Sequence, residues 1–147
     1  MTISNSLRDK DIIDILQSQD VKINGIYMKD ELSKKLKKGF YVVNLQSSFQ
    51  GNGTHWTALY YNPKLSIYFD SYGYIPPLEV EAKIKPYIYN DIDIQSYSST
   101  ACGYFCIAFI LYMNAEKNKL KGFKEFIETF QIDTRNNDKK LYRLLYY

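Results

Sequence analysis

The sequence has little of what defines several classes of protein. Its two cysteines, Cys102 and Cys106, lie four residues apart on one predicted helix and would make a poor disulfide. The longest apolar run, residues 107–113, is too short to cross a bilayer, and no secretory signal is visible. The formal net charge of +3 is too small to indicate nucleic-acid binding by itself. We therefore expect an intracellular protein in a reducing compartment, without a membrane partner.

The bulk composition is that of a globular protein. Hydrophobic residues make up 46% of the chain and charged residues 24%, which are ordinary proportions. A chain of 147 residues can bury a sizeable core, and no linker, repeat or low-complexity tract divides it. We expect one domain over residues 1–147.

The pattern of apolar residues predicts an α+β fold. A small antiparallel or mixed sheet should pack around a central buried helix, with other helices at its flanks. The turn signal Asn62-Pro63-Lys64 separates two strand-like segments, which should form a hairpin. The expected strands are residues 40–46, 55–61, 65–70 and 92–95. The expected helices lie within 1–20, at 30–39, 76–85 and 101–113, and around 123–130 and 141–145.

Local signals set the expected details of the helices. Ser6 and Asp9 resemble a capping pair, Asp30 should cap the second helix, and Gly39 should end it. The lysines of that second helix form a solvated face or, alternatively, bind nucleic acid or an acidic partner. They are Lys34, Lys35, Lys37 and Lys38. From helix 76–85 the residues expected to face the core are Leu78, Ala82 and Ile84.

The segment 98–113 reads as a polar turn that opens a helix apolar on every side, which is typical of a helix in the middle of a domain. Ser99 or Thr100 is placed to cap it, and Cys102 would lie in the first turn. A thiol there is more easily deprotonated, because the free N–H groups and the helix dipole favour an anion. The alternative is that Cys102 is an inert small hydrophobe, which is our interpretation of Cys106.

The hairpin brings a histidine and an acid together. If Tyr60 pairs with Leu65, His55 falls opposite Asp70, with Cβ atoms about 4.5–5.5 Å apart. A carboxylate beside an imidazole fixes its tautomer and stabilises the imidazolium. His55 is the only histidine in the chain, so a base that works near neutral pH has one obvious candidate.

Two other interpretations of His55 stay open at this point. A lone histidine is often a structural residue with a satisfied hydrogen bond. A zinc site formed with Asp70, Cys102 and Cys106 is less favoured, because no CxxC or HxxxH spacing supports it.

Taken together, four fragments resemble the adenain-type cysteine proteases, the maturation proteases of adenoviruses and other DNA viruses. This family belongs to the clan of SUMO and ubiquitin-like deconjugating proteases. The order His, Asp, Gln, Cys is that clan's order, and Gln95 lies seven residues before Cys102 as in the adenovirus pattern. The likeness spans about residues 40–113, and the acid is Asp where the adenovirus enzyme has Glu. The fragments are residues 53–59, residues 68–73, Gln95 and residues 101–106.

The resemblance implies a papain-like, adenain-like cysteine protease fold and a role for each matching residue. Cys102 would be the nucleophile, His55 the general base and acid, and Asp70 the residue that orients His55. Gln95 would donate its side-chain amide to the oxyanion hole together with the backbone N–H of Cys102. Trp56 is expected to pack in the core and to shape the cleft secondarily. The candidate substrate-binding residues are Gly53, Trp56 and Gly103, and no cofactor or metal is expected.

The implied function is cleavage of viral structural precursor proteins during virion maturation. Capsid or core precursors would be the substrates, with small residues, especially Gly, near the scissile bond. We expect a monomer that acts in the virion and in the cytoplasm or viral factory of the host cell. An activating peptide or DNA stays open, although a disulfide-linked activator fits poorly because Cys106 lies inside the helix. The alternatives are a deconjugating protease that acts on ubiquitin-like modifiers and an inactive scaffold on the same fold.

Overall fold

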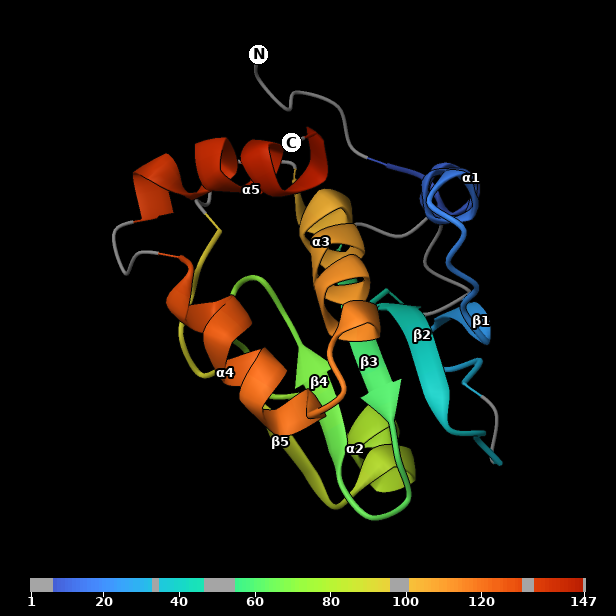
Figure 1. The fold of residues 1–147 in the computed structure, drawn as a ribbon. Helices are drawn as coiled ribbons and strands as arrows, with labels where there is room; N and C mark the ends of the chain where they lie inside the picture. The colour runs from blue at the N-terminus through green and yellow to red at the C-terminus, as the bar shows by residue number, and fades with distance from the viewer. Residues whose placement is uncertain (1–6, 33–34, 47–54, 96–100, 131–133, 147) are drawn as a thin grey trace.

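The computed structural model describes residues 7–32, 35–46, 55–95, 101–130 and 134–146 (Figure 1). Its strands are β1 (Gly25–Met28), β2 (Gly39–Asn44), β3 (Trp56–Tyr61), β4 (Ser66–Phe69) and β5 (Tyr87–Tyr89). Its helices are α1 (Asp9–Ser18), α2 (Leu78–Ile84), α3 (Cys102–Ala115), α4 (Lys119–Glu128) and α5 (Asn137–Tyr146), with a 3₁₀ turn at Thr134–Asn136.

The strands of the described residues form one mixed sheet in the order β1-β2-β3-β4-β5. The outer pairs β1–β2 and β4–β5 are parallel, whereas the inner pairs β2–β3 and β3–β4 are antiparallel. The predicted α+β class with a mixed sheet is therefore confirmed, as is the hairpin of β3 and β4.

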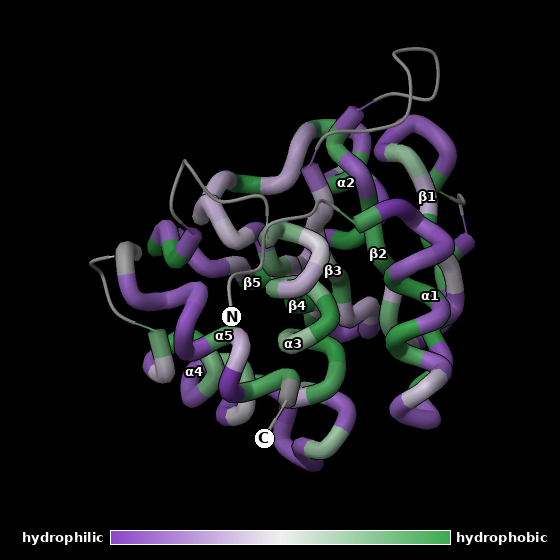
Figure 2. The backbone as a smooth tube through the Cα atoms, turned by 90° about the horizontal axis from the view of Figure 1, so that it is seen from above, coloured by the Kyte–Doolittle hydropathy of each residue, from purple (hydrophilic) through white to green (hydrophobic). Residues whose placement is uncertain are grey.

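Helix α3 lies in the interior, where helices α1, α4 and α5 pack around it on one face of the sheet (Figures 1 and 2). Phe109 of α3 stacks on Phe69 of β4, with ring centroids 5.1 Å apart. Phe126 of α4 meets Phe109 edge-on at 5.9 Å. A helix enclosed in this way must be apolar on every side, as the sequence predicted.

Helix α2 covers the opposite face of the sheet, where Val80 and Ile84 pack with Leu59 and Tyr68. Strand β3 alternates between the two faces. Its core residues on the α3 side are Trp56, Ala58 and Tyr60, whereas Leu59 and Tyr61 belong to the other side.

The predicted helix at residues 30–39 is wrong. The described residues of this segment form turns and irregular backbone, and the buried side chain of Leu32 anchors them. The side chain of Asn24 donates to the carbonyls of Lys37 and Lys38, so tertiary contacts replace the helical hydrogen bonds expected there. The described lysines of the basic cluster, Lys35, Lys37 and Lys38, are all exposed.

Two further predictions were wrong. Residues 92–95 form no strand, because the N–H groups of Ile94 and Gln95 both donate to the carbonyl of Ser71; the fifth strand is β5 instead. In α2 the prediction fails for Leu78, which is 81% exposed, and for Ala82, which is exposed, but Ile84 is buried as predicted and Val80 is buried as well. Leu78 and Ala82 lie four residues apart on one face of α2, and Val80 and Ile84 lie four residues apart on another. The helix turns the face with Val80 and Ile84 toward the core.

The helix caps also differ from the prediction. Helix α3 begins after Ala101, which makes no side-chain capping bond, and the predicted caps Ser99 and Thr100 lie outside the described residues. Helix α1 begins after Arg8, whose backbone N–H donates to Asp11 at 3.0 Å. Ser6 also lies outside the described residues.

Candidate active site

The β3–β4 register places His55 and Asp70 diagonally rather than directly opposite one another. Tyr60 pairs with Ile67, two residues beyond the predicted partner Leu65. Continuing this register sets Asp70 opposite Thr57. An even shift keeps each side chain on its own face of the sheet, so His55 and Asp70 still share one side.

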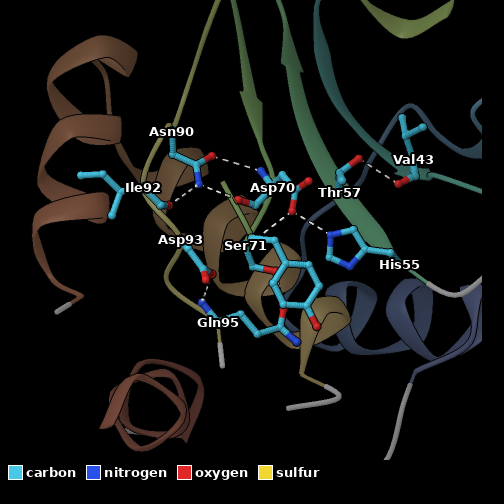
Figure 3. A network of polar contacts seen from close by, with 10 residues as sticks. Val43, His55, Thr57, Asp70, Ser71, Asn90, Ile92, Asp93 and Gln95 are labelled. Carbon is cyan, nitrogen blue, oxygen red and sulfur yellow. Dashed lines mark hydrogen bonds and ion pairs between the residues drawn. The ribbon is translucent and has the colours of Figure 1, made fainter. Parts of the chain in front are cut away.

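The two side chains nevertheless meet in a short hydrogen bond. His55 Nε2 lies 2.7 Å from Oδ1 of Asp70, and Oδ1 also accepts the N–H of Tyr72 at 2.8 Å (Figure 3). The Asp70 side chain is fully buried and that of His55 is 14% exposed. The carboxylate therefore holds the imidazole by one nitrogen and leaves Nδ1 as the other ring nitrogen that can exchange a proton.

Asn90, directly after β5, holds the backbone of Asp70 at both ends. Its Oδ1 accepts the Asp70 N–H at 3.1 Å, and its Nδ2 donates to the Asp70 carbonyl at 2.5 Å and to that of Ile92 at 3.2 Å. The side-chain amide thus continues the ladder between β4 and β5 beyond the last paired residues (Figure 3). Asn90 was not predicted as a site residue, and its only signal in the sequence is its place after the Tyr-Ile-Tyr run.

Cys102 is the first residue of α3, and the fold brings its side chain beside His55. Burial lowers the pKa of His55, but hydrogen bonding and charge from Asp70 and Cys102 outweigh it and raise the pKa from 6.5 to about 9. Both neighbours favour the imidazolium form. The structure thus brings together three of the residues predicted to act jointly.

Tyr72 covers one face of the His55 ring. The two rings are stacked, with centroids 4.6 Å apart and planes inclined by 21°. Burial and the nearby negative groups raise the pKa of the Tyr72 hydroxyl, so it stays neutral at physiological pH. This contact could not be predicted from the sequence, because it depends on the turn after Asp70.

Gln95 is fully buried beside the residue that follows Asp70. Its backbone N–H donates to the Ser71 carbonyl at 3.0 Å and to Asp93 Oδ1 at 3.1 Å, and its side-chain Oε1 accepts from the Ser71 hydroxyl. Figure 3 shows the Gln95 side chain next to Ser71. Gln95 was predicted to lie in a short strand, but it lies in an irregular segment that is hydrogen-bonded to Ser71.

The predicted substrate-binding residues have different outcomes. Gly53 lies outside the described residues. Trp56 is 7% exposed and packs in the α3-side core, where its Nε1 donates to the Leu7 carbonyl at 2.9 Å. Gly103 was expected to leave room for a substrate backbone, but a Cβ there would lie 3.1 Å from Cβ of Leu7. The side chain of Leu7 therefore fills that space.

The remaining chemistry-bearing groups lie apart from this arrangement. Cys106 is fully buried, and burial raises the pKa of its thiol well above the ordinary value. Among the described residues, no group of three or more His, Cys, Asp and Glu side chains is arranged to hold a metal ion. None of the helices described has both the length and the apolar character needed to span a membrane.

Comparison with known proteins does not extend this picture. The chain matches no model of a protein family and no curated protein. The adenain-type resemblance therefore stays a prediction that rests on the quoted motifs.

Proposed function

We propose that the protein is a cysteine-type endopeptidase of the adenain-like kind, with Cys102 as nucleophile and His55 as base. The observation that carries the proposal is that one imidazole contacts both partners the chemistry needs. His55 is hydrogen-bonded to buried Asp70 at 2.7 Å, and it also lies close enough to Cys102 for a hydrogen bond and the negative charge of a thiolate there to raise the pKa of His55. A nucleophile, a base and a residue that orients the base are the set required for acyl transfer.

The reaction follows from these positions. Sγ of Cys102 attacks the scissile carbonyl carbon, and its proton is held by His55, whose raised pKa favours that state. Breaking of the C–N bond leaves a thioester, and His55 gives its proton to the leaving amine. A water molecule deprotonated by His55 then hydrolyses the thioester and restores the thiol. The Gln95 amide and the Cys102 N–H would stabilise the oxyanion, since the first N–H groups of a helix have no intrahelical acceptor.

The substrate class comes from the sequence resemblance. We propose that the enzyme cleaves capsid or core precursors during virion maturation, as a monomer in the virion and in the interior of the host cell. Near the scissile bond we expect small residues, especially Gly.

The test is incubation of the purified protein with capsid precursors from the same genome, followed by mass spectrometry of new termini. Wild type should generate new termini, Cys102→Ala should generate none, and Cys106→Ala should match wild type. Processing by Cys102→Ala equal to wild type would refute the proposal. Efficient labelling by a ubiquitin-like protein that carries a C-terminal electrophile, without precursor cleavage, would make the protein a deconjugase instead.

A further inference from the structure

Ser71 holds Gln95 at two points. Its carbonyl accepts the backbone N–H of Gln95 at 3.0 Å and that of Ile94 at 2.8 Å. Its hydroxyl donates to Oε1 of the Gln95 side chain. Both residues are fully buried, so the contact lies away from solvent.

The hydroxyl contact decides which way the carboxamide faces. An amide carries an acceptor oxygen on one side and a donor NH₂ on the other, and a half-turn about its last torsion exchanges the two. Because the Ser71 hydroxyl donates to Oε1 of Gln95, the side-chain nitrogen of Gln95 is directed away from Ser71. A single residue next to Asp70 thus sets both the position and the orientation of the Gln95 amide.

We propose that Ser71 is a positioning residue that keeps the Gln95 amide turned so that its N–H can act on the oxyanion. This inference rests on the proposed peptidase activity. Ser71 does not touch the substrate in this role, and it acts only through Gln95. Oxyanion stabilisation depends on donors fixed in advance, so a freely rotating amide would be a weaker donor in the transition state.

The expected effect is smaller than the loss of Gln95 itself. Removing one oxyanion-hole donor typically costs about 10²–10³ in kcat. Ser71→Ala keeps the amide but releases its orientation, for which we expect a roughly 5–20-fold lower kcat and little change in KM. Because Ser71 acts through Gln95, Ser71→Ala should add almost nothing to Gln95→Ala.

The experiment measures kcat and KM with a fluorogenic peptide amide ending in Gly-Gly for wild type, Ser71→Ala, Gln95→Ala and the double variant. Ser66→Ala is the matched control, because Ser66 is also fully buried and its hydroxyl bonds to Asn62 in the β3–β4 turn. Ser71→Gly removes the same hydroxyl if Ser71→Ala fails to fold. The rate of Cys102 alkylation by iodoacetamide, which forms no oxyanion, should be unchanged in every variant that keeps Cys102.

The outcomes separate the two proposals. Reduced kcat in Ser71→Ala, absent in Ser66→Ala and absent on a Gln95→Ala background, is the expected result. An active wild type with an unaffected Ser71→Ala, or fully additive losses in the double variant, would overturn the role of Ser71 and leave the peptidase intact. A wild type that turns over no peptide or precursor would remove both.

Discussion

Cys102 and Cys106 are the same residue type one turn apart on α3, yet their surroundings differ. Cys102 begins the helix, is 8% exposed, and lies beside His55. Cys106 is wholly enclosed, and burial raises the pKa of its thiol well above the ordinary value. We therefore expect position on the helix, not residue type, to decide which thiol reacts.

The same contrast holds for the polar residues near the helix start. Two of the proposed catalytic residues are held by a buried polar residue: Asn90 binds the backbone of Asp70, and the Ser71 hydroxyl binds the side chain of Gln95. Around Cys106 the neighbours belong to the hydrophobic core. The start of α3 therefore lies near buried polar residues, and the part around Cys106 packs in the hydrophobic core.

The largest expected effect separates the two cysteines in turnover. Cys102→Ala should lower kcat/KM by about 10⁴-fold or more, because the nucleophile is lost. Cys106→Ala should leave kcat/KM unchanged and lower the free energy of unfolding by about 1–2 kcal/mol, because it removes a small buried side chain. Kinetic assays and urea unfolding measure both, and equal activity losses in the two variants would contradict the comparison.

Alkylation sharpens the same comparison without a substrate. At neutral pH, iodoacetamide should label Cys102 in the folded protein at least about 10²-fold faster than Cys106, which should react only after unfolding. Peptide mapping by mass spectrometry measures the two rates. Urea-unfolded protein is the control, in which both thiols should react alike; comparable labelling in the folded protein would show that Cys106 is accessible.

A smaller effect is expected from the loss of Asn90, which holds the backbone of Asp70. Asn90→Ala leaves a buried N–H and C=O of Asp70 without their partner, so the free energy of unfolding should fall by about 2–4 kcal/mol. We expect kcat to fall by about 10-fold, since Asp70 would orient His55 less well. The matched control is Asn62→Ala in the β3–β4 turn, which should leave kcat unchanged. If both variants had equal kcat, Asn90 would have only a structural role.

The pH dependence of stability gives a further difference. The pKa of His55 is about 9 in the folded protein against an ordinary 6.5, so its contribution to the free energy of unfolding is complete below pH 6.5. That contribution, up to about 3 kcal/mol, is lost as the pH rises through 9. Urea unfolding between pH 6 and 10 should show this loss in wild type but not in His55→Gln. Parallel curves for the two proteins would exclude it.

Much of the site could be predicted because it depends on face and order rather than on exact register. The predicted hairpin register was wrong by two residues, but an even shift kept His55 and Asp70 on one face and the contact survived. The central helix was predictable because few structures other than a buried helix suit an unbroken apolar segment of that length.

What could not be predicted depends on tertiary contacts of irregular backbone. The sequence of residues 92–95 is typical of a strand, but the Ser71 carbonyl accepts the N–H groups of Ile94 and Gln95. The roles of Asn90 and Ser71 could not be predicted locally, because their partners lie 20 and 24 residues away in sequence. The contact of Leu7 with Gly103 could not be predicted either, because the two residues lie far apart in the sequence.

The most direct test of the central claim is an NMR titration of His55, the only histidine and therefore a unique imidazole signal. If Asp70 and Cys102 both act on it, wild type should titrate with an apparent pKa of about 9. Cys102→Ala and Asp70→Asn should each lower that value toward 6.5. A wild-type pKa near 6.5 that Cys102→Ala leaves unchanged would mean that the sulfur and the imidazole do not interact.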